Sequence, residues 1–322
     1  MLDYVIRSGT LIDGSGEAPR TADVGIRDGR IVAVGEVDET ASTELDAAGL
    51  MVAPGVVDPH THYDAQLFWD PSASPSNVHG VTTVIGGNCG FTLAPLNAED
   101  ADYIRRMMAK VEGMPLTALE TGVPWNWSSF GDYLGALEGN LGVNAGFLVG
   151  HCALRRKVMG ASRGEEVATD EEITAMRALL AESLAAGGLG FSSSQSRTHS
   201  DGEGRPISSR YADRREMLAF CDEVAAHEGT TLEYITNGCL DSFSPEEIEL
   251  MTTMSVTAQR PLNWNVLTVD VRSAERIEHQ LSAAAAAAAA GGRIVALTMP
   301  TLVPMNMSFR THCALFLIPG WG

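Results

Sequence analysis

The first 54 residues alternate short apolar runs with turn residues. Each of four apolar runs leads to a glycine, twice within an Asp-Gly pair: residues 4–6, 11–12, 24–26 and 31–34. Asp-Gly between apolar runs is a strong hairpin signal. The pattern predicts a small antiparallel, β-sandwich-like sheet domain over residues 1–54.

From Pro54-Gly55 onward, short buried-strand patterns alternate with helical ones. Seven apolar runs read as strands: residues 56–57, 81–85, 145–149, 188–191, 230–235, 261–267 and 294–297. Strands that alternate with helices indicate parallel βαβ units, and so many of them favour an α/β fold of the (β/α) TIM-type barrel kind over residues 55–322. A doubly wound sheet is the alternative, but no GxGxxG or Walker sequence occurs.

Two of the predicted helices carry clear start signals. Thr169 precedes an acidic turn and an apolar stripe at i, i+3 and i+4 spacing, which is typical of a capped amphipathic helix. Ser244-Pro245 opens a second helix with proline at its first position. The last strand pattern lies close to the chain end, and an apolar stretch at 317–322 follows without a helix pattern. We therefore expect an incomplete barrel and a truncated chain.

Composition and charge exclude some partners. The 322 residues are 45% hydrophobic and 20% charged, which is typical of a globular protein. A formal net charge of −19 argues against nucleic-acid and anionic membrane surfaces, because these are bound by clustered Lys and Arg. A small anionic substrate bound by one local Arg stays compatible with this charge, and so does a homo-oligomer.

The cysteines and the apolar segments indicate the compartment. Five cysteines show no CxxC spacing, so neither a disulfide framework nor a zinc finger is indicated. Asp3 and Arg7 interrupt the first ten residues, which therefore do not resemble a signal segment. The alanine run at 283–290 is too short to span a bilayer. We expect a soluble protein of the reducing cytoplasm.

The clearest chemical signal is the sequence Asp58-Pro59-His60-Thr61-His62, directly after an apolar run. Side chains at i and i+2 of an extended chain face the same side. His60 and His62 are therefore expected to project together from the carboxyl end of a strand, where barrel enzymes keep their active sites. Neutral imidazoles bind divalent metals. Alone, an HxH pair is equally consistent with two loop histidines in ordinary hydrogen bonds; its position after the first barrel strand favours the metal.

Cys89 follows the second predicted barrel strand within Gly86-Gly87-Asn88-Cys89-Gly90. Glycines around it allow a close backbone approach that presents the thiol at the barrel mouth. A thiolate there is a good zinc ligand. The local residues leave a second interpretation open, in which Cys89 is a small buried hydrophobic residue.

Several motifs together resemble the amidohydrolase superfamily. Residues 4–16 look like its leader, and residues 53–64 resemble its first-strand metal motif. Residues 87–90, 150–155 and 188–193 are similar to the D-aminoacylase, or N-acyl-D-amino-acid deacylase, branch. The resemblance covers essentially the whole chain.

This resemblance implies a β-sandwich beside a metal-bearing barrel. The barrel usually binds zinc, with one or two divalent metal ions per site. The resemblance also implies hydrolysis of a linear amide in an N-acyl-D-amino acid by a metal-activated water. Carried over residue by residue, it makes His60, His62 and Cys89 metal ligands. The general base of the family is an Asp on a later strand, which is expected beyond Gly322, so no catalytic base is assigned.

The chain departs from the branch at the fifth and sixth barrel strands, where the branch usually has histidine ligands. Here those segments contain Glu233 and the pair Asn263 and Asn265. Glu233 is either an oxygen ligand or the partner of a basic residue. The two Asn share one strand face and either contact substrate or water or are structural, since Asn is a poor zinc ligand. The number and identity of the metal ions stay open.

Two further residues are candidates for substrate binding. His151 follows the third predicted strand, and Arg197 lies in a polar loop after the fourth, together with His199. Arg197 offers a bidentate grip on a substrate carboxylate. The alternatives are a structural hydrogen bond for His151 and a solvated loop position for Arg197.

Two other functions stay open. A hydantoinase-like hydrolase of cyclic amides typically uses a carboxylated lysine on the fourth strand, and no lysine occurs near residues 188–194. A catalytically inactive amidohydrolase scaffold would account for the missing later-strand histidines and the unassigned base.

Overall fold

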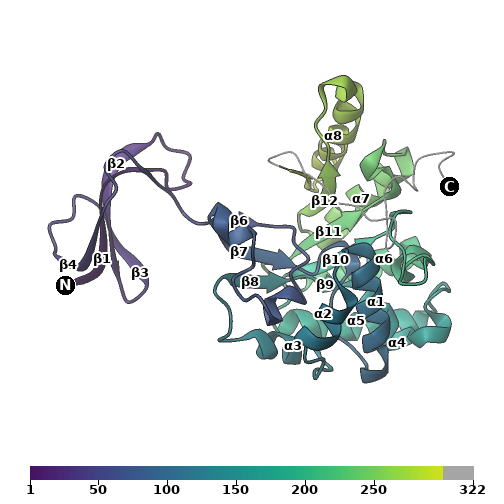
Figure 1. The fold of residues 1–322 in the computed structure, drawn as a ribbon. Coiled ribbons are helices and arrows are strands. Elements are labelled where there is room, and N and C mark those ends of the chain that lie inside the picture. Colours follow the sequence, from purple (N-terminus) through teal and green to yellow (C-terminus); the bar gives the residue numbers. More distant parts are fainter. Residues whose placement is uncertain (300–322) are drawn as a thin grey trace. The chain divides into compact units, whose positions relative to one another are not determined.

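The computed structural model describes residues 1–299, and these divide into two compact units. The first unit covers Met1–Val56, and the second begins at Val57. Figure 1 shows the elements of both units along the chain. The apolar stretch at residues 317–322 lies outside the described residues.

The first unit is one five-stranded sheet. Its strands pair in the order β3-β2-β1-β4, and β5 also pairs with β1. The strands are β1 (Leu2–Leu11), β2 (Arg20–Arg27), β3 (Arg30–Gly35), β4 (Ala41–Asp46) and β5 (Met51–Val52). The predicted hairpin joins β2 to β3 through Asp28 and Gly29, whose φ values of 50° and 70° suit a tight hairpin turn.

The prediction of a purely antiparallel N-terminal sheet is wrong for two strands. Both β4 and β5 pair with β1 in parallel, with Leu2 opposite Ala41 and Thr10 opposite Met51. Asp-Gly pairs determine tight turns between neighbouring strands. They carry no information about which edge of the sheet a later strand will join, and here that edge is the free side of β1.

The second unit contains parallel strands that follow one another in chain order. Its two sheets have the orders β6-β7-β8 and β13-β12-β11-β10-β9, and Leu148 alone separates β8 from β9. Every pairing with a defined register in these sheets is parallel. The strands are β6 (Val56–Asp58), β7 (Val81–Gly86), β8 (Asn144–Phe147), β9 (Val149–Gly150), β10 (Gly190–Ser194), β11 (Thr231–Ile235), β12 (Leu262–Leu267) and β13 (Ile294–Thr298).

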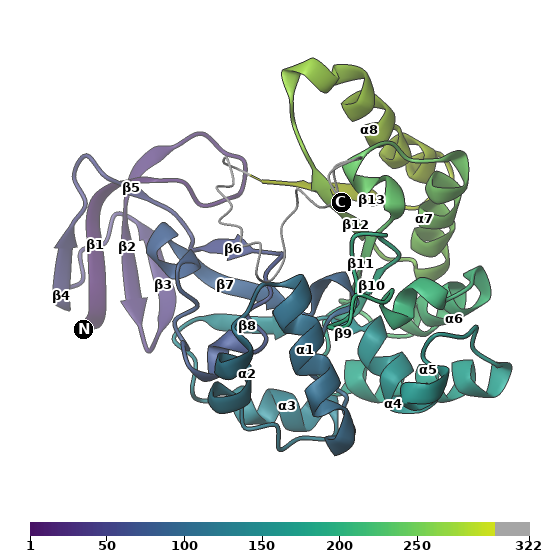
Figure 2. The ribbon, with the colours of Figure 1, turned by 45° about the vertical axis from the view of Figure 1, so that its right-hand side comes forward.

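Helices connect these strands and cover one side of the five-stranded sheet of the second unit, β13-β12-β11-β10-β9. Successive helices from α4 to α8 pack against each other, and each of these five helices also contacts a strand (Figures 1 and 2). The helices are α1 (Ala101–Val111), α2 (Leu116–Gly122), α3 (Phe130–Leu137), α4 (His151–Arg163), α5 (Asp170–Ala185), α6 (Arg214–Ala225), α7 (Pro245–Ala258) and α8 (Ala274–Ala289). Both predicted helix starts are confirmed, because Thr169 and Ser244 form capping boxes at α5 and α7.

The described fold is therefore α/β, as predicted, but residues 57–299 do not form a closed barrel. Val56 and Val57, predicted to be buried, are 53% and 54% exposed, and they lie on β6, an edge strand of its described sheet. The four described cysteines are free thiols. None of the described helices is long and apolar enough to cross a membrane.

A substitution at Gly190, at the start of β10, tests the pairing of β10 with β11. The φ of Gly190 is +144°, and a Cβ there would overlap the carbonyl oxygen of Thr231 on the paired strand. We expect Gly190→Ala to lower the free energy of unfolding by about 2–4 kcal/mol, from backbone strain and overpacking together. Urea unfolding followed by circular dichroism measures this change.

Gly135 in α3 provides the matched control. It is exposed, and a Cβ there would meet no atom within 4 Å. Gly135→Ala should leave stability unchanged or raise it by about 0.5–1 kcal/mol, because alanine has the higher helix propensity. Equal changes in the free energy of unfolding for the two substitutions would show that the close approach of β10 to β11 does not require glycine at position 190.

Candidate metal centre

The two histidines of the HxH motif lie directly after β6. Thr61 between them continues the strand pairing, because its N–H donates to Ile85 O at 2.9 Å. Thr61 is buried, and His60 and His62 turn to the other side with ring centroids 5.2 Å apart. The predicted common orientation of the two imidazoles is what the structure shows.

Cys89 meets these imidazoles. Its Sγ lies 3.5 Å from His60 Nε2 and 3.7 Å from His62 Nε2. The three ligand atoms all lie within 4.8 Å of one another. We call these three residues the His–Cys cluster. Strand register and loop geometry thus bring together residues that are 27 and 29 positions apart.

Buried side chains hold the loop that carries Cys89. In this Cys89 loop (residues 87–90), three residues have positive φ: Gly87 at 72°, Cys89 at 59° and Gly90 at 78°. A positive φ is rare for a residue with a Cβ, so the surroundings must impose it on Cys89. The Ser192 hydroxyl on β10 donates to Gly87 O and accepts from Gly90 N at 3.1 Å.

Two buried carboxylates complete this support. Asp64 accepts from Gly87 N at 3.0 Å, and Glu233 on β11 accepts from Cys89 N at 2.7 Å. Neither carboxylate has an ion-pair partner among the described residues. Burial raises the pKa of Asp64 to about 7 and the pKa of Glu233 to about 8, although the loop N–H groups act in the opposite direction.

The His–Cys cluster is uncharged at neutral pH in the absence of a cation. Burial, followed by the neighbouring imidazole, lowers the pKa of His60 to about 3, and burial lowers the pKa of His62 to about 4. Burial and the nearby Glu233 raise the pKa of the Cys89 thiol well above its usual value. Neutral imidazoles are ready to bind a metal, whereas the thiol must lose its proton as a metal binds.

Glu112 and His199 also lie beside the cluster. Glu112, directly after α1, places Oε1 3.6 Å from His62 Nε2. The His199 ring contacts Phe91, which also contacts His62, and its Nδ1 bonds the Ser194 hydroxyl at 2.7 Å. The sequence placed His199 in a candidate loop but gave Glu112 no role. One sequence feature that could have indicated Glu112 is its position directly after a helix, where the helix dipole disfavours negative charge.

The structure brings Glu233 and Asn265 to the cluster. Asn265 Nδ2 donates to Glu233 Oε1, so both oxygens of that carboxylate accept hydrogen bonds from protein groups. A basic partner for Glu233, the alternative considered from sequence, is not found in residues 1–299. Asn263 pairs with Glu233 in strand register, and its Oδ1 is buried without a hydrogen-bond partner in the described residues.

His151 belongs to a separate buried network. Its Nδ1 bonds Ser193 Oγ at 2.8 Å and its Nε2 bonds Glu216 Oε1 at 2.7 Å. Arg155 donates to both oxygens of Glu216, and all three side chains of this ionic group are fully buried. Both His151 nitrogens are therefore bonded to protein groups, so as placed this side chain offers no free polar atom to a substrate.

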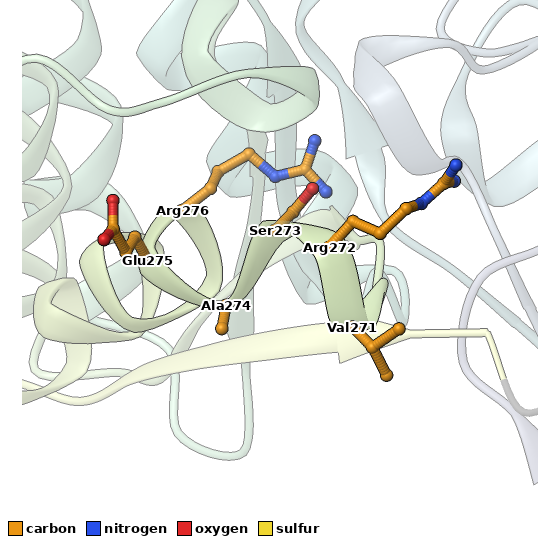
Figure 3. Close-up of a pocket in the computed structure, with 6 residues that line it drawn as sticks. All are labelled: Val271, Arg272, Ser273, Ala274, Glu275 and Arg276. Atoms are coloured by element: carbon orange, nitrogen blue, oxygen red, sulfur yellow. The ribbon is translucent and has the colours of Figure 1, made fainter.

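Arg197 is exposed, and its backbone N–H donates to Asn237 Oδ1 at 2.7 Å. No hydrogen bond or ion pair fixes its guanidinium within residues 1–299. A shallow surface hollow elsewhere is lined by Val271, Arg272, Ser273, Ala274, Glu275 and Arg276 (Figure 3). Its lining is one contiguous segment at the start of α8 and includes no residue of the His–Cys cluster.

The donor set fits a divalent metal. Zinc binds imidazole nitrogen at about 2.0–2.1 Å and thiolate sulfur at about 2.3 Å, so ligand atoms around one tetrahedral ion lie about 3.3–3.6 Å apart. The two sulfur-to-nitrogen distances in the cluster are 3.5 and 3.7 Å. Two neutral imidazoles and a thiol at this spacing match a zinc-type donor set.

Comparison with known proteins agrees with the family resemblance of the sequence motifs. The model of the amidohydrolase family matches residues 43–320. The D-aminoacylase of Alcaligenes xylosoxydans xylosoxydans is 40% identical over 229 residues, which are 70% of this chain and 43% of that protein. The chain thus spans less than half the length of this curated relative.

Two solved structures are similar over most of the chain. One, from work on the binuclear metal centre of D-aminoacylase, has a TM-score of 0.70 at 30% identity and covers 94% of this chain and 59% of that one. The other is N-acyl-D-glutamate deacylase of Bordetella bronchiseptica with zinc and a phosphonate inhibitor, with a TM-score of 0.69 at 26% identity, covering 92% and 58%. These findings confirm the resemblance to the D-aminoacylase branch.

The support of the Cys89 loop by Ser192 can be tested directly. We expect Ser192→Ala to weaken zinc binding about 10–100-fold, because the loop loses two hydrogen bonds and Cys89 loses its fixed orientation. Competition with a chromophoric chelator measures the dissociation constant. The control is Ser183→Ala, which removes an equally buried hydroxyl that bonds only Leu179 O within α5. Equal affinities in both variants would contradict the role of Ser192.

The network of Arg155 and Glu216 is expected to stabilise the fold. Glu216→Gln leaves the buried guanidinium without a counter-charge, so the free energy of unfolding should fall by about 3–5 kcal/mol. Chemical denaturation measures the loss. Glu249→Gln, which breaks an exposed ion pair with Arg214, should have little effect because solvent screens that pair. A similar loss of unfolding free energy in both variants would show that burial does not make the Arg155–Glu216 ion pair more important to stability than the exposed pair.

Proposed function

This chain belongs to the amidohydrolase family, and from that premise we propose that it is a metal-dependent hydrolase of linear amides that deacylates N-acyl-D-amino acids. The observation that carries the proposal is the convergence of His60, His62 and Cys89 at zinc-ligand spacing. The named relatives, a D-aminoacylase and an N-acyl-D-glutamate deacylase, indicate the substrate class.

The proposed cofactor is zinc, held by His60, His62 and Cys89. When bound, a divalent ion supplies Lewis-acid polarisation of the amide carbonyl and lowers the pKa of water. Glu233 accepts from the Cys89 backbone N–H and from Asn265 Nδ2, which favours a positioning role for Glu233 over direct ligation. We leave the general base unassigned, as in the sequence-based expectation.

The residues of the chain contribute chiefly by orientation. The Cys89 loop is fixed before any ligand arrives, so its thiol does not need to reorganise when the metal binds. His199 and Phe91 form one wall beside His62. Arg197 is exposed on a loop that follows β10, and we retain it as the candidate group for a substrate carboxylate. His151 is better assigned to the buried network.

We also propose that the described strands of the second unit are part of a TIM-type barrel that residues 57–299 do not close, with the sheet domain at residues 1–54 and the barrel domain from residue 55. The chain-ordered parallel strands and the covering helices favour this arrangement. The cluster residues follow β6 and β7 at their carboxyl ends, which is where barrel enzymes place their chemistry.

The experiment is metal analysis together with hydrolysis assays on the purified protein. We expect near-stoichiometric zinc and release of amino acid from N-acetyl-D-amino acids, with little from the L-enantiomers or from hydantoins. Cys89→Ala should lower zinc affinity by more than about 100-fold, because it removes one of three ligands, and activity should fall with it.

The control is Cys221→Ala, which removes another fully buried free thiol, on α6. This variant should keep both zinc and activity. A wild-type protein without zinc would favour the inactive scaffold, and hydrolysis of hydantoins in preference to acyl-amino acids would favour the cyclic-amide alternative.

A further inference from the structure

We propose that Arg210 and the Nε2–H group of His199 together bind the carboxylate of the substrate, beside the His–Cys cluster. This inference rests on the proposed hydrolysis of N-acyl-D-amino acids and names the residues that hold the end of the substrate that is not attacked. In such a substrate only the amide nitrogen and the α-carbon separate the carboxylate from the carbonyl carbon that water attacks. The group that binds the carboxylate must therefore border the metal centre.

Arg210 lies at the same end of β10 as the Cys89 loop. The hydroxyl of its neighbour Ser209 donates to Ser194 O, on the last residue of β10, at 2.6 Å. A Cβ at Gly90 would lie 3.4 Å from Ser194 N, so the Cys89 loop meets the same residue. Arg210 and Cys89 are thus each next in sequence to a residue that contacts Ser194.

His199 links Arg210 to the cluster. Its backbone oxygen accepts from Arg210 Nη1 at 3.4 Å, and its ring contacts Phe91 with the ring centroids 5.1 Å apart. Phe91 also contacts His62, at 6.3 Å between ring centroids. Burial, followed by the imidazoles of the cluster, lowers the pKa of His199 to about 4, so this side chain is neutral at pH 7.

The hydrogen bond to Ser194 determines which ring nitrogen of His199 carries the proton. The Ser194 hydroxyl is fully buried and accepts from Ser196 N at 3.2 Å. Within residues 1–299, its own proton has one acceptor, His199 Nδ1 at 2.7 Å, and a buried hydroxyl donates where an acceptor exists. The ring hydrogen is therefore on Nε2. This atom has no partner in the same residues and is open to solvent.

The guanidinium of Arg210 also has unused donors. It is half-buried, and within residues 1–299 its one hydrogen bond is to His199 O and it forms no ion pair. Residues 300–322 contain no Asp or Glu, so they supply no acidic side chain to pair with it. Arg205, by contrast, meets three carboxylates at 3.0 to 3.2 Å. In a chain of net charge −19, a half-buried guanidinium without a carboxylate indicates a place for an anionic ligand.

Arg197, the other candidate for the carboxylate, differs from Arg210 in how it is held. Its side chain is exposed, and no hydrogen bond or ion pair fixes its guanidinium in the described part of the chain. A side chain that is already held loses less conformational freedom when the ligand binds. Arg210 is therefore better placed to bind the carboxylate, with His199 as the second donor.

Hydrolysis of a matched pair of substrates tests the proposal. N-acetyl-D-methionine carries the carboxylate, and N-acetyl-D-methioninamide carries a neutral carboxamide in its place. We expect Arg210→Met to raise KM for the acid about 10–100-fold at nearly unchanged kcat, because a charge-assisted hydrogen bond that is present before and during the reaction is lost. Hydrolysis of the carboxamide should stay as in the wild type.

Two further variants examine the two donors separately. Arg210→Lys should restore part of the affinity for the acid, since it keeps the charge but not the bidentate geometry. His199→Phe should raise the same KM by a smaller factor, because it keeps an aromatic ring against Phe91 and removes the N–H group.

Arg293→Met is the matched control, because it removes an exposed arginine directly before β13, at the amino end of the parallel strands. It should leave both substrates unaffected. An unchanged KM in Arg210→Met overturns the proposal, and so does an equal rise for acid and carboxamide. A rise in Arg197→Met alone would assign the carboxylate to Arg197. If Arg210→Met does not fold, as judged by thermal melting, Arg210→Lys decides by the same comparison.

Calorimetry separates this proposal from the proposed function. N-acetyl-D-methionine is titrated into protein stripped of metal by a chelator, where binding is measured without turnover. Weaker binding by Arg210→Met than by wild type, with no hydrolysis by the zinc-loaded wild type, supports the carboxylate site and overturns the proposed function. Hydrolysis by the wild type with Arg210→Met unaffected removes only the role of Arg210. A wild-type protein that neither binds nor hydrolyses the acid overturns both.

Discussion

The hydrogen bonds that buried side chains make to the Cys89 loop are the constraint on which the centre depends. Ser192 bonds the loop at two points, and Asp64 and Glu233 bond it at two others. These side chains come from distant parts of the chain, so the loop acquires its shape only when β7, β10 and β11 are already assembled. The positive φ of Cys89 is tolerated because the N–H groups of Gly87, Cys89 and Gly90 and the carbonyl oxygen of Gly87 are all held.

This support also sets the electrostatics of the centre. The same burial that fixes the loop removes water from Asp64, Glu233 and Cys89, and it leaves His62 and Glu112 only 16% and 17% exposed. It raises the pKa of Glu112 and of Glu233 to about 8, and it lowers the pKa of His62 to about 4. The site is therefore organised in a neutral, partly protonated form. A divalent cation would favour the ionised carboxyl and thiol groups and would keep His62 neutral, which couples metal binding to proton release.

A second buried polar network has a different role. Arg155, Glu216 and His151 bond one another, and of their nitrogens and oxygens only Arg155 Nε is buried without a hydrogen-bond partner among the described residues. The contrast is physical: buried charges that are paired support a fold, whereas buried carboxylates without a basic partner indicate a place for a cation.

The sequence by itself determined the alternation of strands and helices, the capped starts of α5 and α7, and the pairing of His60 with His62. These features depend on local periodicity and on side-chain chemistry within a few residues. Only the tertiary structure decided the parallel pairing of β4 with β1, the burial of His151 in an ionic network, and the positions of Ser192 and Glu112 beside the cluster. Those contacts join residues 39 to 105 positions apart, and local sequence carries no signal for such closures.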